Sequence, residues 1–203
     1  GKTLKELDPW SMRRSGYVSV KESVFPFRRF PGVDIILGPE MHSTGEVMGM
    51  GGDFPEAYYK SQLASGQDLP QGGNVFISVN DRDKPEVAAM FADLGFHLLA
   101  TSGTARFLRE RGLEVEEVLK VYEGRPNIVD RMINGDVALV INTASGKNTA
   151  RDSKSIRHTA VSYGVPYCTT VAGAKASAIA IGKRREDTHV ESLQEYYARE
   201  ARG

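Results

Sequence analysis

The sequence contains a single cysteine, Cys168, among 203 residues, so no intrachain disulfide can form. It carries 26 basic and 26 acidic residues, so it has no overall field that would favour nucleic acid. No apolar run is long enough to cross a bilayer, and no signal-like segment opens the chain. These absences favour a cytoplasmic protein that has neither nucleic acid nor membrane among its partners.

Clustered metal ligands and catalytic pairs are also lacking. The four histidines His42, His97, His158 and His189 are scattered without metal-ligand spacing. His97 is expected on a strand and His158 on the exposed face of a helix, while Cys168 is expected as a small buried strand residue. No nucleophile and base can be paired, so the sequence predicts no metal site and no catalytic residue.

What the sequence does contain is the composition of a globular protein, with 40% hydrophobic and 26% charged residues. The first residue is Gly1 rather than methionine, from which we expect a cut or processed piece of a larger protein. The chain divides into two parts of different character, residues 1–70 and residues 74–203.

The second part alternates short apolar runs with helical patterns. The runs predict strands at 74–80, 96–100, 116–121, 137–141 and 165–170, and the patterns predict helices at 84–94, 104–111, 126–133, 149–163 and 172–182. Asp83 and Glu86 are placed as a capping box around Pro85. The continuous apolar run 137–141 is typical of a strand buried on both faces. This alternation predicts an α/β fold with a doubly wound, five-stranded parallel sheet.

Residues 1–70 show no such alternation. Segments 16–27 and 43–52 have the pattern of strands or loops around segment 30–41, and a helix is expected from Phe54 to Leu63. Because this part has too few apolar residues for an independent domain, we expect it to be the end of a domain whose beginning is missing. The polar, glycine-containing stretch 65–73 is the expected linker.

Polar residues gather where the predicted parallel strands end. Ligands of open parallel sheets bind beyond the carboxyl ends of the strands, near the point where the strand order reverses. The stretch LLATSGTARFLRERG (98–112) places hydroxyls at the start of a helix, where backbone N–H groups favour an anion. Lysines on neighbouring strands would add point charges for a phosphate, and an asparagine would recognise a sugar or base edge. We call this set the rim residues: Ser78, Lys84, Thr101, Thr104, Lys120, Asn142 and Thr143.

Each rim residue also has a plainer interpretation. A threonine before a helix is commonly only a cap, and a lysine at a strand end is commonly only solvated. Ser145, Thr169 and Thr170 lie at strand ends as well. The stretches TASGKNT (143–149) and GKRR (182–185) lack the glycine spacing and the following hydroxyl of a Walker P-loop, so neither is assigned to that motif.

Four stretches carry a resemblance to a known family: VSVKESVFPFRRFPGVDIILGPEMHSTGEVMG (18–49), ATSGTA (100–105), VYEGRPNIVDRMINGD (121–136) and VINTASG (140–146). The last three resemble the methylglyoxal-synthase-like domain. The whole chain resembles the C-terminal end of the carbamoyl phosphate synthetase large-subunit family, and GPEMHSTGEVMG (38–49) resembles the closing piece of its second ATP-grasp module. The resemblance implies that 1–70 is a remnant of that module with its linker, and that 74–203 is an allosteric domain.

In that family the allosteric domain binds UMP as an inhibitor or IMP as an activator. The resemblance places the nucleotide at Lys84, Thr101, Thr104, Lys120, Asn142 and Thr143. Ala144 stands where close relatives have another threonine, and Ser102 stands where a histidine is common. Relatives also bind ornithine at contacts that match Glu22, Tyr167 and Thr169, with further acidic contacts from residues outside this chain.

The full subunit of the family is an ATP-dependent ligase that forms carbamoyl phosphate for arginine and pyrimidine synthesis from bicarbonate, ATP and ammonia from glutamine. It uses Mg or Mn and works with a glutamine amidotransferase small subunit. The resemblance implies that the present residues hold no cofactor and catalyse nothing themselves. Two alternatives stay open: a ligand-free interaction module between domains, and a methylglyoxal synthase. In that enzyme the base lies in the turn that corresponds to 123–129 here, where Glu123 is the nearest acid but does not match in position.

Overall fold

The computed structural model describes residues 1–7, 16–25, 27, 43–143, 150–184 and 190–200. Within them, the strands form a two-stranded and a five-stranded sheet. The strands are β1 Val18–Val24, β2 Gly45–Gly51, β3 Asn74–Ser78, β4 His97–Ala100, β5 Val115–Glu117, β6 Leu139–Asn142 and β7 Tyr167–Cys168. The helices are α1 Leu4–Leu7, α2 Phe54–Ala64, α3 Lys84–Asp93, α4 Ser102–Arg109, α5 Ile128–Ile133, α6 Ala150–Tyr163, α7 Val171–Arg184 and α8 Leu193–Glu200.

The larger sheet has the strand order β5-β4-β3-β6-β7, and every pairing in it is parallel. From β3 the chain moves outward through β4 to β5, then returns to place β6 on the other side of β3. The strand order therefore reverses between β3 and β6, where a ligand site is expected in such folds. The predicted five-stranded parallel sheet is confirmed.

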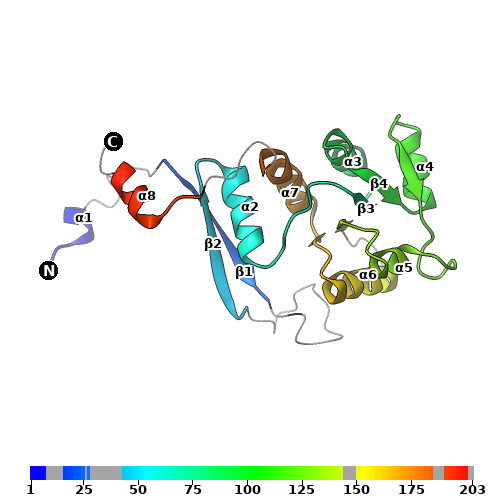
Figure 1. The fold of residues 1–203 in the computed structure, drawn as a ribbon, viewed down its shortest axis with the longest axis horizontal. Helices are drawn as coiled ribbons and strands as arrows, with labels where there is room; N and C mark the ends of the chain where they lie inside the picture. The colour runs from blue at the N-terminus through cyan, green and yellow to red at the C-terminus, as the bar shows by residue number, and fades with distance from the viewer. Residues whose placement is uncertain (8–15, 26, 28–42, 144–149, 185–189, 201–203) are drawn as a thin grey trace.

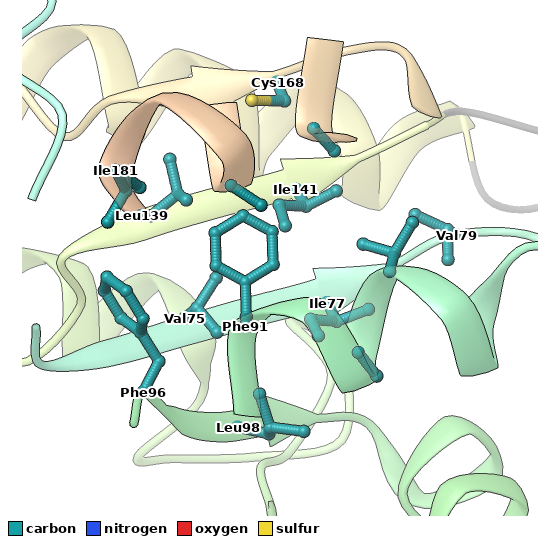
Figure 2. Close-up of a cluster of buried hydrophobic side chains, with 14 of the residues drawn as sticks. Val75, Ile77, Val79, Phe91, Phe96, Leu98, Leu139, Ile141, Cys168 and Ile181 are labelled. Atoms are coloured by element: carbon teal, nitrogen blue, oxygen red, sulfur yellow. The ribbon is translucent and has the colours of Figure 1, made fainter. Parts of the chain in front are cut away.

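Helices cover both faces of this sheet, and each face has its own core. Successive residues of a strand point to opposite faces, so Val75 and Ile77 pack in one core and Phe76 in the other. Helices α3, α4 and α7 supply the first core, whereas α5 and α6 supply the second (Figure 1). Figure 2 shows Phe91 of α3 lying over the first face of the sheet among side chains from β3 and β6.

Residues 18–24 and 45–64 form what we call the N-terminal unit. Here β1 pairs antiparallel with β2, and α2 lies against the two strands (Figure 1). A Cβ on Gly49 would lie 2.0 Å from the carbonyl oxygen of Ala57 and 2.4 Å from the amide of Ser61, so the backbones of β2 and α2 are in direct contact. Asp53 caps α2 by accepting from the amide of Glu56 at 3.0 Å. The predicted helix 54–63 is confirmed.

The stretch 65–73, expected as a linker, packs on the parallel-sheet domain. Leu69 belongs to the first core, and Arg184 Nη1 donates to the Leu69 carbonyl at 2.8 Å and to Asp68 Oδ1 at 3.0 Å. Helix α2 also packs on α7 (Figure 1). The N-terminal unit therefore buries apolar surface that it could not bury alone.

Several predicted boundaries are wrong. The carboxylate of Asp83 does not cap α3, because its backbone is already helical and its Oδ2 accepts from Asn80 Nδ2 at 2.7 Å. Helix α4 begins at Ser102 rather than Thr104, and α5 begins two residues late because Asn127 caps it in a capping box with Asp130.

Strands β5 and β7 are shorter than predicted, and helix α8 was not predicted. Segments 30–41 and 144–149 lie outside the described residues. Among the helices that are described, none has both the length and the apolar character needed to cross a membrane.

Candidate functional site

The carboxyl ends of β3, β4 and β6 bring rim residues to one edge of the sheet. Ser78 and Asn142 are the last residues of their strands and pair with each other. The next amide, that of Thr143, donates to the Ser78 carbonyl at 3.0 Å. Thr101 directly follows β4, the other neighbour of β3. Ser78, Thr101 and Asn142 therefore lie at the ends of three adjacent strands, at the same edge of the sheet.

Asn142 is the best-defined polar group of this edge. Its side chain is 2% exposed, and its Oδ1 accepts from Ser153 Oγ of α6 at 3.2 Å. Its Nδ2 and the neighbouring Thr143 Oγ1 are buried without a hydrogen-bond partner among the described residues. A buried polar atom without a partner costs about 1–3 kcal/mol. A ligand that offers hydrogen-bond acceptors would satisfy the Nδ2 group and could satisfy the hydroxyl.

Thr101 and Thr104 flank the start of α4. Thr101 is the N-cap residue, with ψ at 159°, yet its hydroxyl makes no capping hydrogen bond. The plain interpretation of Thr101 as a side-chain cap is therefore wrong. Thr104, one turn further, is buried at 7% exposure. The first-turn N–H groups of a helix have no acceptor within the helix, so this end of α4 offers donors beside the two hydroxyls.

Each of the two rim lysines, Lys84 and Lys120, forms an ion pair with a nearby carboxylate. The side chain of Lys84 is 11% exposed, and its Nζ lies 2.6 Å from Asp81 Oδ1 and 5.6 Å from the ring centre of Phe107 on α4. Lys120 lies beyond the end of β5, in a turn where its Nζ is 3.0 Å from Glu123 Oε1. The hydrogen bond to Glu123 raises the pKa of Lys120. Each rim lysine therefore already has a carboxylate partner within the protein.

An open hollow of about 300 Å³ follows Lys120 along the chain. Its lining includes Tyr122, Arg125, Asn127 and Asp130. Sequence reasoning did not find it, because it is shaped by how the turn between β5 and α5 folds onto the first turn of α5. Its lining begins at Val121, the residue after Lys120.

A second polar cluster joins the N-terminal unit to β7. Glu22 of β1 accepts from Gln62 Nε2 at 3.0 Å, and burial raises the pKa of its carboxyl. Burial, and secondarily the charge of Glu22, raise the pKa of Tyr167 to about 12. The charge of a residue in the N-terminal unit, Glu22, thus affects the pKa of a residue in the parallel sheet, Tyr167. Thr169 follows β7 and is half-buried.

Sequence reasoning missed two members of this second cluster. They are Gln62 and Tyr58, and the Tyr58 hydroxyl lies 3.4 Å from Ser177 Oγ. Burial raises the pKa of Tyr58 to about 12. Both residues lie on α2, and their helical spacing was the only available signal. Within the ranges that the structure covers, no three His, Cys, Asp or Glu side chains are grouped to hold a metal ion.

Comparison with known protein families shows the class of domain to which the parallel sheet belongs. Residues 85–169 match the MGS-like domain family, so the chain contains an MGS-like domain. The match runs from the first turn of α3 to just beyond β7, so it includes four of the five strands of the parallel sheet but not β3. It includes five of the seven rim residues: Thr101, Thr104, Lys120, Asn142 and Thr143.

The whole chain is similar to carbamoyl phosphate synthase large chains. It is 52% identical over 200 residues to the large chain of Myxococcus xanthus and 48% identical over 200 residues to that of Nostoc sp., covering 97% of this chain and 18% of each relative. It is 55% identical over 188 residues to the large chain, C-terminal section, of Aquifex aeolicus, covering 88% of this chain and 35% of that protein. The family resemblance inferred from the sequence is confirmed, and the chain spans about a fifth of the full-length relatives.

Proposed function

We propose that the MGS-like domain is a regulatory module that binds a nucleoside monophosphate, UMP or IMP, at the rim. The observation that carries this proposal is the pair of buried groups at the switch point, Asn142 Nδ2 and Thr143 Oγ1, which have no partner among the described residues. Phosphate and ribose oxygens are acceptors of the kind that these groups need. Burial without a partner is costly, so a ligand that fills this place gains affinity.

Four further rim residues have a role in this arrangement. The hydroxyls of Thr101 and Thr104 and the first-turn amides of α4 would donate to phosphate oxygens. Lys84 and Lys120 would supply positive charge. A nucleotide that fits one arrangement of the domain better than another shifts the balance between them, and such coupling is commonly about 1–3 kcal/mol.

The names of the relatives support a wider proposal for the protein to which the domain belongs. We infer an ATP-dependent carbamoyl phosphate synthase large chain of the cytoplasm, in which 1–70 closes an ATP-grasp module. Bicarbonate, ATP with Mg or Mn, and ammonia from a glutamine amidotransferase small subunit would react in the rest of that chain. The rim would then regulate chemistry that occurs elsewhere.

Ornithine is the proposed second effector, at Glu22, Tyr167 and Thr169. Glu22 is a half-buried carboxylate, and no ion pair to it is found in the described part of the chain. A carboxylate in such a place favours an ammonium group, which would restore the ionised form that burial disfavours.

Methylglyoxal synthase activity is the competing function, because that enzyme shares the fold. Glu123 is the nearest acid to the expected base, but it accepts from the amide of Lys120 at 2.9 Å and pairs with the Lys120 ammonium. These contacts lower the pKa of Glu123. A general base works best with a pKa near the operating pH, so this carboxylate favours binding over catalysis.

Calorimetric titration with UMP, IMP, inorganic phosphate and uridine tests the proposal, together with an assay for turnover of dihydroxyacetone phosphate. We expect saturable nucleotide binding without turnover. Lys120→Ala should weaken UMP binding about tenfold or more, because hydrogen bonds to charged groups are worth about 1.5–3 kcal/mol. Lys21→Ala is the matched control, since Lys21 pairs with Glu46 at 2.7 Å in the N-terminal unit. Undiminished affinity in folded Lys120→Ala would remove Lys120 from the site, and turnover would overturn the regulatory assignment.

A further inference from the structure

Each rim lysine is paired with a carboxylate three residues away. Asp81 precedes Lys84, with 2.6 Å between Oδ1 and Nζ, and Glu123 follows Lys120, with 3.0 Å between Oε1 and Nζ. Hydrogen bonding to Lys84 lowers the pKa of Asp81. Both carboxylates are therefore ionised at neutral pH, and the two lysines and two carboxylates sum to no net charge.

The two carboxylates are held to different degrees. The side chain of Asp81 is 79% exposed, and within the described residues its one hydrogen bond is to the Lys84 ammonium, so it can turn out into solvent when another anion arrives. The side chain of Glu123 is 30% exposed and is bound twice, by the ammonium and by the backbone amide of Lys120 at 2.9 Å. The Glu123 amide in turn donates to the Lys120 carbonyl at 3.0 Å, which closes the turn. Glu123 is therefore the harder of the two to displace.

A phosphate monoester carries about −1.5 to −2 charges at pH 7. It must approach lysines whose charge is already compensated, and it meets two carboxylates of its own sign. We propose that Asp81 and Glu123 are affinity-determining residues that act as internal counter-ions, competing with the phosphate group of the ligand for Lys84 and Lys120. This inference rests on the proposed function and adds to it two acidic residues that weaken binding.

The consequence is a gain of affinity when either carboxylate charge is removed. Glu123→Gln keeps an amide oxygen that can accept from the Lys120 N–H, so the turn is preserved while the charge is lost. Exposed ion pairs are weak, so we expect UMP and inorganic phosphate to bind about two- to fivefold more tightly to Glu123→Gln. Asp81→Asn should give a smaller gain, because Asp81 is more easily displaced. The gain should shrink at high salt, which screens exposed charges.

The test is calorimetric titration of the chain, the two single variants and the double variant at low and high salt, with thermal melts to verify folding. Glu46→Gln is the matched control, because it removes a carboxylate from an exposed lysine pair in the N-terminal unit. Uridine is the matched ligand, because it lacks the phosphate. Neither the Glu46→Gln variant nor uridine binding should show the gain.

The outcomes separate this inference from the proposed function. Tighter binding of UMP and phosphate by the two rim variants supports the inference, and so does binding by these variants when the unaltered chain binds nothing. Binding by the unaltered chain with equal or weaker binding by folded variants overturns the inference alone. Absence of binding by every protein overturns both.

Discussion

The two parts of the chain bury their strands in different ways. Every residue of β6 in the parallel-sheet domain is buried, whereas β1 in the N-terminal unit alternates between half-buried and exposed residues. Strand β6 lies between two helical layers, whereas β1 is covered by a helix on one face. A sheet with one covered face depends on close contact with that cover, and the N-terminal unit achieves this contact through glycine.

The two polar sites differ in a similar way. At the junction of the parts, Glu22 has a protein partner in Gln62. At the rim, Asn142 Nδ2 and Thr143 Oγ1 have no partner among the described residues. Polar groups without a partner therefore mark the rim as a ligand site, whereas at the junction it is the half-buried charge of Glu22 that favours a ligand.

The largest expected effect comes from Gly49→Ala, which breaks the contact between β2 and α2. The new Cβ would lie 2.0 Å from the Ala57 carbonyl oxygen, and backbone atoms cannot yield as a flexible side chain can. We expect a loss of about 3 kcal/mol or more in the free energy of unfolding. Chemical denaturation measures this loss, and hydrogen exchange shows whether it is concentrated in β1, β2 and α2.

Gly45→Ala is the control for that substitution. Gly45 begins the same strand, and a Cβ there would meet nothing within 4 Å. It should change the free energy of unfolding by no more than about 0.5 kcal/mol. Equal effects of the two substitutions would mean that close packing against α2 does not hold the N-terminal unit.

A smaller effect is expected from Ser153→Ala, which sharpens the comparison at the rim. Loss of the Ser153 hydroxyl leaves Asn142 Oδ1 without its donor, so the amide is no longer fixed with Nδ2 free for a ligand. Because a hydrogen bond contributes about 0.5–1.5 kcal/mol, UMP affinity should fall about two- to tenfold. Calorimetric titration measures this change.

Thr159→Ala is the control for the rim. Thr159 is also buried on α6, but its hydroxyl donates to the Ser155 carbonyl, one turn earlier in the same helix, at 2.9 Å. This variant should lose stability without losing UMP affinity. Equal affinities of both variants and the unaltered chain would remove Ser153 as the residue that orients Asn142.

The smallest expected effect is that of Glu22→Gln at the junction. Burial raises the pKa of Glu22, so its contribution to stability is fully present below the unfolded-state pKa and is lost as pH rises through the folded-state pKa. At pH 7 the variant should therefore melt about 1–2 °C higher than the unaltered chain. Near pH 3, where the carboxyl is protonated, the difference should vanish.

Calorimetric melts between pH 3 and 7 measure this dependence, with Glu46→Gln as an exposed control. A difference in melting temperature that is constant across this range would show that the ionisation of Glu22 does not affect stability. If Glu22 also binds ornithine as proposed, the more stable variant should have lost that affinity.

Much of the fold could be predicted because its signals are local. The apolar run 137–141 predicted a strand buried on both faces, and β6 is buried throughout. Thr101 was predicted beyond a strand end, where it lies. Asp83 was wrongly predicted as a cap, because spacing along the chain does not show that Asn80 binds its carboxylate.

The candidate site was predictable in its residue types but not in its connections. Lys84, Lys120 and Asn142 were identified from strand ends, while Ser153 and the two counter-ions were not. Ser153 reaches Asn142 only because α6 packs on the sheet, and a buried serine in a helix gives no pattern of its own. Asp81 and Glu123 are close in sequence to their lysines, but which side chains pair depends on how each turn folds.

The sequence by itself determined the strands and helices of the parallel-sheet domain and the polar ends of its strands. Hydrophobic periodicity and turn residues act over a few neighbouring positions, so they can be seen in the sequence. Only the tertiary structure decided which polar atoms are satisfied, which lysines are compensated, and how the N-terminal unit packs against α7. These depend on distances between segments far apart in the chain, which no local pattern specifies.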